Sequence, residues 1–157
     1  MSVLHFKAEE VLQMAERVEE AGIRFYRRGA EMQPELRELF LELAQMEEDH
    51  RRTFAETRAS LTEGGRAILH EDTRAYLEAW TDSHLFSQDP AEALQGLKTP
   101  QEVLKGAVAL ERDSIAFYVA LEAVVPEGWG REKVREVIRE EQRHFATLNQ
   151  RLKALGG

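Results

Sequence analysis

Apolar and small residues recur at steps of three and four along four long stretches of this chain, which is the spacing of one face of an α-helix. The first stretch extends from about residue 7 to 31. The second begins at Pro34, a residue suited to the first turn of a helix, and continues until Gly64-Gly65 stops it. The first part of the chain therefore predicts two helices joined by a short turn.

The second part of the chain repeats this arrangement. The segment Thr99-Pro100-Gln101-Glu102 is a capping box with proline in the first turn, and it opens a third helix. Residues 126–130, with the sequence Pro-Glu-Gly-Trp-Gly, break that helix, and a fourth helical pattern follows from Val134 to Leu152. Two such helix pairs predict an all-α fold, a four-helix bundle.

Residues 64–98 form a long connection between the second and third helices. We expect it to hold a helix around Arg66 to Trp80 and a short helix after Asp89-Pro90. A long connection is required if the second and third helices run parallel. The sequence therefore predicts a long helical crossover between the two pairs.

Six polar residues replace apolar ones on the inward faces of the four helices. A Glu-x-x-His motif lies on the second helix and another on the fourth, and a glutamate of the preceding helix comes before each motif at nearly the same interval. Glu19 precedes Glu47 by 28 residues, and Glu111 precedes Glu141 by 30. The complete set is Glu19, Glu47, His50, Glu111, Glu141 and His144. Two facing helix pairs would place these four carboxylates and two imidazoles around a common centre.

A centre of this kind is expected to bind two metal ions. Burying an unpaired carboxylate costs several kcal/mol, whereas two divalent cations balance four carboxylate charges. Residues three apart on a helix share a face, so each Glu-x-x-His motif can direct both side chains at one site. We expect Glu47 and Glu141 to bridge the ions, Glu19 and Glu111 to be terminal ligands, and each histidine to cap one ion. Mixed oxygen and imidazole ligation suits two iron ions, with manganese or zinc as alternatives.

A simpler explanation exists for a single Glu-x-x-His motif, which on a helix is commonly a surface pair or a capping contact. Two motifs in core stripes, each preceded by a glutamate at a matched distance, favour the metal centre. Tyr26 and Tyr118 lie seven residues after Glu19 and Glu111. Each phenol is therefore expected either to pack in the core or to donate a hydrogen bond to a neighbouring ligand carboxylate.

Other acidic and imidazole side chains are expected to stay outside the centre. Glu20 and Glu140 are adjacent to proposed ligands, and about 100° of helical rotation should turn them away into solvent. His5, His70 and His84 match no ligand spacing and are expected at the surface or at helix caps.

The composition agrees with one helical domain spanning residues 1–157. Hydrophobic residues make up 43% of the chain and charged residues 32%, with only 4 prolines. The net charge of −8 argues against a nucleic-acid partner, because affinity for polyphosphate comes from clustered Lys and Arg. The chain has no cysteine, which excludes disulfides, thiolate zinc sites and iron-sulfur clusters.

At the proposed ligands the sequence resembles the rubrerythrin-like branch of the ferritin-like di-iron carboxylate superfamily. The segments from Glu111 to Tyr118 and from Glu141 to His144 carry the resemblance most strongly. It implies a ferritin-like four-helix bundle with a carboxylate-bridged di-iron centre. Two departures limit it: without cysteine there is no rubredoxin domain, so a separate electron donor is implied, and Ser114 stands where the family places an extra glutamate.

We therefore expect a non-haem di-iron oxidoreductase that reduces hydrogen peroxide with electrons from a separate donor protein. The alternatives are a ferroxidase of ferritin type that uses oxygen, a manganese catalase, and a structural helical module without chemistry. Solution size, oxygen evolution and metal analysis would discriminate between them.

The expected setting is the cytoplasm, with no membrane and no nucleic-acid partner. The N-terminus lacks the basic start and apolar run of a secretory signal, and no window approaches 18 consecutive apolar residues. A homodimer is expected, because the connection carries more apolar residues than one bundle needs: Leu69, Tyr76, Leu77, Trp80, Leu85 and Phe86.

Overall fold

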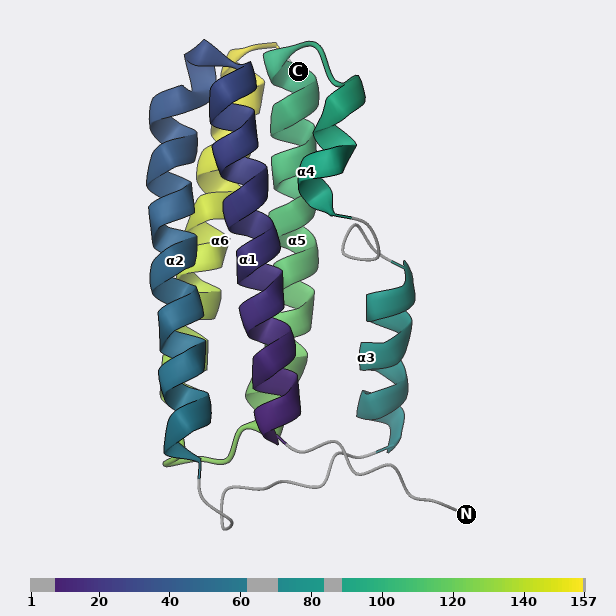
Figure 1. Ribbon diagram of the computed structural model, residues 1–157, viewed down its shortest axis with the longest axis vertical. Coiled ribbons are helices and arrows are strands. Elements are labelled where there is room, and N and C mark those ends of the chain that lie inside the picture. Colours follow the sequence, from purple (N-terminus) through teal and green to yellow (C-terminus); the bar gives the residue numbers. More distant parts are fainter. Residues whose placement is uncertain (1–7, 62–70, 84–88, 157) are drawn as a thin grey trace.

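Four long helices form the body of the protein and lie side by side in the computed structural model (Figure 1). The structure describes residues 8–61, 71–83 and 89–156. The four helices are α1 (Ala8–Met32), α2 (Arg37–Ser60), α5 (Pro100–Val124) and α6 (Arg131–Ala154). The all-α, ferritin-like four-helix bundle predicted from the sequence is confirmed.

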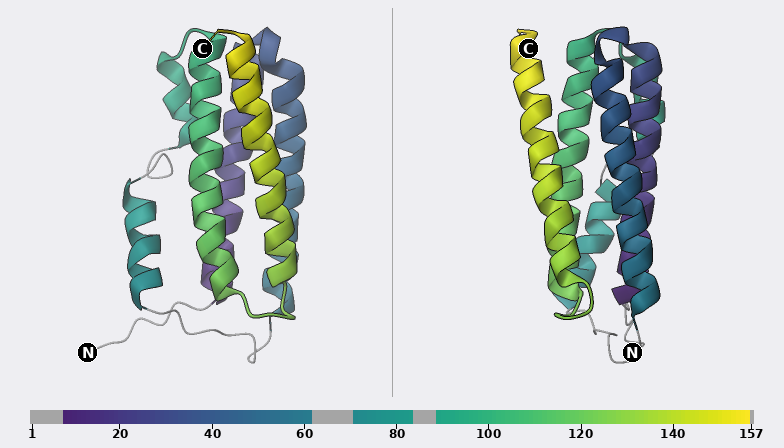
Figure 2. Two further views of the ribbon diagram at one scale, coloured as in Figure 1. Left: turned by 180° about the vertical axis from the view of Figure 1, so that it is seen from behind. Right: turned by 90° about the vertical axis from the view of Figure 1, so that its left-hand side faces the viewer.

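Short connections join the helices within each pair, at opposite ends of the bundle (Figure 2). The 3-10 turn η1 (Pro34–Leu36) links α1 to α2, and the segment around Gly130 links α5 to α6. Gly130 has a φ of 116°, a conformation that favours glycine, and a Cβ there would meet the Thr57 side chain. Following the chain in Figure 1, α1 and α6 run one way, while α2 and α5 run the other. The second and third core helices are therefore parallel, as predicted.

The crossover between these parallel helices contains α3 (Glu71–Ser83), α4 (Pro90–Ala93) and the 3-10 turn η4 (Leu94–Gly96). Asp89 accepts a hydrogen bond from the Ala91 backbone N–H at the start of α4, and Thr99 accepts one from Glu102 at the start of α5. The predicted short helix after Asp89 is present, and so is the predicted cap at Thr99. The reciprocal contact of a capping box is shifted by one residue, because the Glu102 carboxylate accepts the backbone N–H of Lys98 and not that of Thr99.

Two predicted boundaries were wrong. The second helix ends at Ser60, well before Gly64-Gly65, because Leu61 already has an extended backbone with a ψ of 129°. The crossover helix continues beyond Trp80 to Ser83. The glycine pair and residues 66–70 lie outside the described residues.

The buried core consists of two apolar clusters. One contains Leu12, Phe54, Phe117 and Val137, and the other contains Phe25, Phe40, Leu104 and Leu148. The inward-facing polar residues interrupt the apolar stripes between these two groups. Burial of large side chains on both sides holds the polar centre in place and keeps bulk water from it.

Some of the crossover residues expected at a dimer contact are buried within this chain, and others are exposed. Leu77 and Trp80 are buried, and the Trp80 ring packs against Phe117 with centroids 4.7 Å apart. Tyr76 is 44% exposed. Leu69, Leu85 and Phe86 lie outside the described residues, and the homodimer stays a prediction.

Charged side chains connect the helices on their outer faces. Arg58 of α2 donates to Glu16 of α1 at 2.7 Å, and Arg135 of α6 donates to Glu122 of α5 at 2.7 Å. None of the helices in the described ranges is both long enough and apolar enough to cross a membrane.

Candidate metal centre

All four bundle helices contribute to a single buried polar cluster. Glu19 comes from α1, Glu47 and His50 from α2, Glu111 from α5, and Glu141 and His144 from α6. Each of these six residues is at most 4% exposed. The helical register explains the arrangement, because each residue occupies a position of the stripe that its helix buries.

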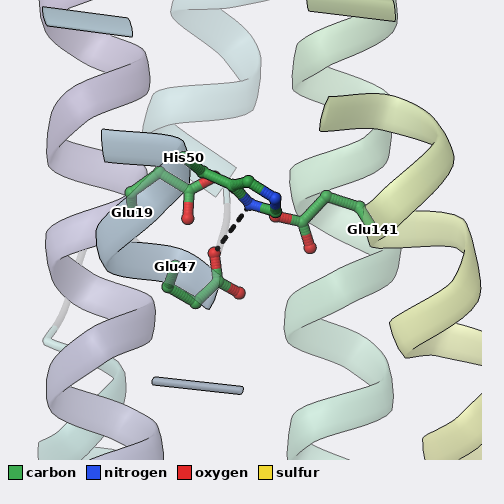
Figure 3. A group of neighbouring side chains, drawn as sticks. All are labelled: Glu19, Glu47, His50 and Glu141. Atoms are coloured by element: carbon green, nitrogen blue, oxygen red, sulfur yellow. Dashed lines mark hydrogen bonds and ion pairs between the residues drawn. The ribbon is translucent and has the colours of Figure 1, made fainter. Parts of the chain in front are cut away.

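The cluster consists of two overlapping groups of potential ligand atoms. Glu19, Glu47, His50 and Glu141 form one group, and Glu47, Glu111, Glu141 and His144 form the other. Within each group the nearest oxygen and nitrogen atoms all lie within 4.8 Å of one another. Figure 3 shows the first group, with three carboxylates directed at the His50 ring. Glu47 and Glu141 belong to both groups, which is the placement that two bridging carboxylates require.

Tyr26 and Tyr118 support the two carboxylates that belong to only one group each. The Tyr118 hydroxyl donates to Oε1 of Glu19 at 2.6 Å, and the Tyr26 hydroxyl donates to Oε1 of Glu111 at 2.5 Å. Both rings are fully buried. Each phenol therefore both packs in the core and hydrogen-bonds a carboxylate, and that carboxylate lies on the opposite helix pair.

Both histidines direct Nδ1 toward the shared carboxylates. The His50 Nδ1 lies 2.9 Å from Glu141 and 3.6 Å from Glu47, and the His144 Nδ1 lies 3.6 Å from Glu141. The Nε2 atoms of both rings point away from the cluster. The Nε2 of His50 lies 2.5 Å from Oε2 of Glu140, whereas the Nε2 of His144 lies 3.2 Å from the sulfur of Met46.

The Glu140 contact corrects the expectation that this side chain is only solvated. Glu140 is 36% exposed, but its carboxylate reaches across from α6 to the His50 ring on α2. The position of Glu140 on α6 directs its side chain away from the centre, as expected. The carboxylate lies instead beside the outer nitrogen, Nε2, of His50 on α2. Glu20 is exposed as expected.

Several buried polar atoms of the cluster have no hydrogen-bond partner among the described residues. They are Oε2 of Glu19, Oε2 of Glu111, Oε2 of Glu141, and Nδ1 of His144. Buried polar atoms are almost always paired, because an unpaired one loses its water without compensation. Here the unpaired atoms all belong to the six converging side chains, and they are carboxylate oxygens and an imidazole nitrogen. The residues present therefore fit a pair of metal ions.

Burial and mutual repulsion disturb the pKa values of these carboxyl groups. Burial raises the pKa of Glu47 to about 7, with the nearby charge of Glu141 adding to the effect. Burial likewise raises the pKa of Glu111 well above its usual range. For Glu141 burial acts upward too, but the proximity of Glu111, His144 and His50 outweighs it and holds the pKa well below the usual range.

The pKa of His50, the histidine on α2, is raised, which favours a positive charge on its ring beside these carboxylates. Burial alone would lower the pKa of His50, but its contacts with Glu141 and Glu47 raise the pKa to about 11. In the metal-free cluster, protons on His50 and Glu111 therefore supply part of the compensation for the buried negative charge. Divalent cations would supply it more fully.

A pocket of about 210 Å³ between α2 and α6 lies against the outer side of the His50 ring. Its lining includes Met46, Asp49 and His50 of α2, and Glu136 and Glu140 of α6. The two residues that contact the outer histidine nitrogens, Met46 and Glu140, both line this pocket. The pocket thus approaches the centre on the side where the histidines lie.

The remaining residues of interest lie away from the cluster or beyond the described residues. Ser114 is buried, and its hydroxyl donates to the Leu110 carbonyl of its own helix at 2.9 Å. His5, His70 and His84 lie outside the described residues. Sequence reasoning missed Met46 and the role of Glu140. Their shared position directly before the glutamate of each Glu-x-x-His motif was the available signal.

Comparison with known proteins agrees with this geometry. A solved structure from Thermotoga maritima, assigned to the ferritin-like diiron-carboxylate proteins, is 26% identical in sequence and has a TM-score of 0.76, over 97% of this chain and 98% of that chain. A search of curated proteins gave no match. The family model described as Rubrerythrin matches residues 10–96, which is more than half of the chain. This chain therefore belongs to the rubrerythrin family.

Proposed function

We propose that this chain is a non-haem di-iron oxidoreductase that reduces hydrogen peroxide to water with electrons from a separate donor protein. The observation that carries the proposal is the pair of overlapping ligand groups with Glu47 and Glu141 in common. Membership of the rubrerythrin family supports it, as does the similarity to a protein assigned to the ferritin-like diiron-carboxylate class.

The charge of the cluster supports two divalent ions over one. Four carboxylates carry a charge of −4, which two divalent cations balance. Oxygen and imidazole ligands suit iron and manganese, and the absence of cysteine leaves no thiolate to favour zinc or copper(I). Iron also fits the reaction, because it changes oxidation state by one electron.

Each of the six side chains has a role in this proposal. Glu47 and Glu141, which belong to both groups, would be shared by the two ions, Glu19 and Glu111 would each hold one ion, and the Nδ1 atom of each histidine would complete the set. Tyr26 and Tyr118 hold the terminal carboxylates through Oε1. The Oε2 atoms of Glu19 and Glu111, which have no hydrogen-bond partner among the described residues, would be available to an ion. When bound, two ferrous ions supply the two electrons that, with two protons, convert one peroxide into two waters.

The catalytic proposal is tested by comparing oxidants. The protein is loaded anaerobically with two ferrous ions per chain and mixed rapidly with peroxide or with oxygen, while iron oxidation is followed by absorbance. We expect one peroxide to oxidise two ferrous ions without release of oxygen, and faster than dissolved oxygen does. Rapid oxidation by oxygen with repeated uptake of ferrous iron would instead establish a ferroxidase. Oxygen evolution from peroxide by the manganese-loaded protein would establish a catalase.

The bridging roles are tested by metal analysis. Glu47→Ala or Glu141→Ala removes a carboxylate that belongs to both groups, so the bound metal is expected to fall from two ions per chain to one or none. Glu20→Ala is the matched control, because Glu20 neighbours Glu19 on α1 but is exposed. Retention of two ions by Glu47→Ala, or loss of metal by Glu20→Ala, would contradict the assignment.

A further inference from the structure

The two halves of the centre have matching inner ligands. Each group offers three carboxylates and one imidazole, and each histidine directs Nδ1 inward. The carboxylate that belongs to only one group accepts a tyrosine hydroxyl in both halves, from Tyr118 on one side and from Tyr26 on the other. The inner ligands therefore give no reason for the two metal positions to differ.

The halves differ at the outer nitrogen of each histidine. Met46 directly precedes Glu47, and Glu140 directly precedes Glu141, so the two residues occupy the same position in the repeated motif. Each contacts the histidine of the opposite helix. The Nε2 of His50 meets the Glu140 carboxylate at 2.5 Å, and the Nε2 of His144 meets the Met46 sulfur at 3.2 Å.

A carboxylate and a thioether differ strongly as hydrogen-bond acceptors. A carboxylate accepts a strong, charge-assisted hydrogen bond, while a thioether sulfur is a weak acceptor. A histidine that binds metal through one nitrogen donates its other N–H to such a partner, which fixes the ring and makes the binding nitrogen more basic. Loss of such a partner typically costs about 10- to 100-fold in metal affinity.

We propose that Glu140 is a positioning residue that makes the two metal positions unequal, so that the position formed by Glu19, Glu47, His50 and Glu141 binds its ion first and more tightly. This inference rests on the proposed dinuclear centre. The His144 position, backed by Met46, fills second. The protein consequently passes through a state with one ion before the pair is complete.

Titration of the metal-free full chain with cobalt(II) tests this order, because cobalt reports its ligands by absorbance and by paramagnetic NMR shifts. The native protein is expected to bind two ions in two steps whose dissociation constants differ by about tenfold or more. Glu140→Ala should weaken the first step by about 10- to 100-fold and leave the total at two. Glu140→Gln keeps an oxygen acceptor without the charge, so its first dissociation constant should lie between those of the native protein and Glu140→Ala.

Two further variants separate positioning from general effects. Glu136→Gln removes an acidic charge from the same pocket without touching either histidine, and it should leave both steps unchanged. Met46→Glu supplies the missing carboxylate to His144 and should tighten the second step. The two dissociation constants then become similar because the weaker one falls. A gain of affinity of this kind cannot arise from misfolding.

A spectroscopic signature identifies the histidine involved. In the protein with one cobalt ion, the shifted imidazole N–H of His50 should exchange slowly with solvent, because Glu140 holds it. In Glu140→Ala that resonance should broaden or disappear, which a general loss of stability would not cause while the ion is bound.

Failure of this inference and failure of the proposed dinuclear centre give different results. Fewer than two cobalt ions per native chain would overturn the proposed dinuclear centre and this inference with it. Two ions bound in equal steps, or a first step that responds alike to Glu140→Ala and Glu136→Gln, would overturn the inference alone.

Discussion

Tyr26 and Tyr118 each stabilise a carboxylate that belongs to the opposite helix pair. Tyr118 on α5 donates to Glu19 on α1, and Tyr26 on α1 donates to Glu111 on α5. The pairs are thus joined at the level of single side chains by two crossed hydrogen bonds. A hydrogen bond to a buried carboxylate contributes about 1.5 to 3 kcal/mol, more than a neutral one does.

Tyr118→Phe should therefore lower the unfolding free energy of the metal-free protein by about 1 to 3 kcal/mol, because it leaves a buried carboxylate oxygen without its donor. Denaturant titration followed by circular dichroism measures this change. Tyr76→Phe is the matched control, since Tyr76 is 44% exposed and its loss of a hydroxyl should cost less than about 0.5 kcal/mol. Equal effects of the two substitutions would show that the hydrogen bond to Glu19 contributes nothing.

The pKa shifts in the cluster determine how the stability of the metal-free protein depends on pH. Glu47 titrates at about 7 when folded and near 4.5 when unfolded. Between these values the folded protein keeps a proton that the unfolded chain has released, so stability falls as pH rises. His50 acts in the same direction between its unfolded value of 6.5 and its folded value of about 11.

The metal-free protein should accordingly lose stability as pH is raised from about 5 to 8. The shift of Glu47 alone corresponds to roughly 3 kcal/mol over its window. Thermal unfolding at a series of pH values in the presence of a chelator measures the slope. Glu47→Gln removes this titration and should flatten the curve between pH 4.5 and 7. A native curve that rises through this range would contradict the assignment.

The six converging residues could be predicted from sequence because a polar residue in an apolar stripe is conspicuous, and the repeat displays the pattern twice. The contact between Glu140 and His50 could not, because it depends on how far α6 is rotated and shifted against α2. Helical periodicity specifies the face of a single helix. It contains no information about which side chain of a neighbouring helix meets that face.

At the scale of the helices, α1 and α2 pack closely enough to require a residue without a side chain. A Cβ added at Gly29 would lie 2.6 Å from two ring carbons of Phe40, and that ring is completely buried. The ring cannot move aside without disturbing the apolar cluster around it. Gly29 therefore sets the distance between the two helices near the turn that joins them.

Gly29→Ala should destabilise the protein by about 1 to 2 kcal/mol, because overpacking outweighs the better helix propensity of alanine. Equilibrium unfolding in urea measures the difference. Gly96→Ala serves as the control, since a Cβ at Gly96 has no neighbour within 4 Å. A Gly29→Ala variant as stable as the native protein would mean that α1 and α2 can separate at little cost.

The helices themselves were largely predictable, and their ends were less so. Long apolar periodicity and the capping box at Thr99 located α5 correctly, because a side-chain cap defines the first turn locally. The end of α2 at Ser60 carries no comparable signal. Leu61 leaves the helix before any glycine or proline is reached, and its side chain packs against one of the two apolar clusters, a tertiary contact that local sequence does not display.

For the molecule as a whole, the buried cluster links all four helices at one level of the bundle. The apolar clusters on either side stabilise the fold, whereas the four carboxylates between them repel one another. Folding of the metal-free protein therefore works against this repulsion. Metal ions that bind the folded state alone should relieve it and strengthen the contact between the α1–α2 and α5–α6 pairs.

Manganese(II) should consequently raise the midpoint of thermal unfolding relative to protein with chelator. At a free concentration of 100 times the dissociation constant, one bound ion adds about 2.7 kcal/mol, which corresponds to at least about 5 °C for a chain of this size. Magnesium is the control ion, because it retains water and makes little use of imidazole ligands. Glu47→Ala, which lacks a shared carboxylate, should show much less stabilisation by manganese. An equal rise with magnesium, or an undiminished rise in Glu47→Ala, would place the stabilising ion elsewhere on the acidic surface, because only the buried cluster requires both an imidazole-binding metal and Glu47.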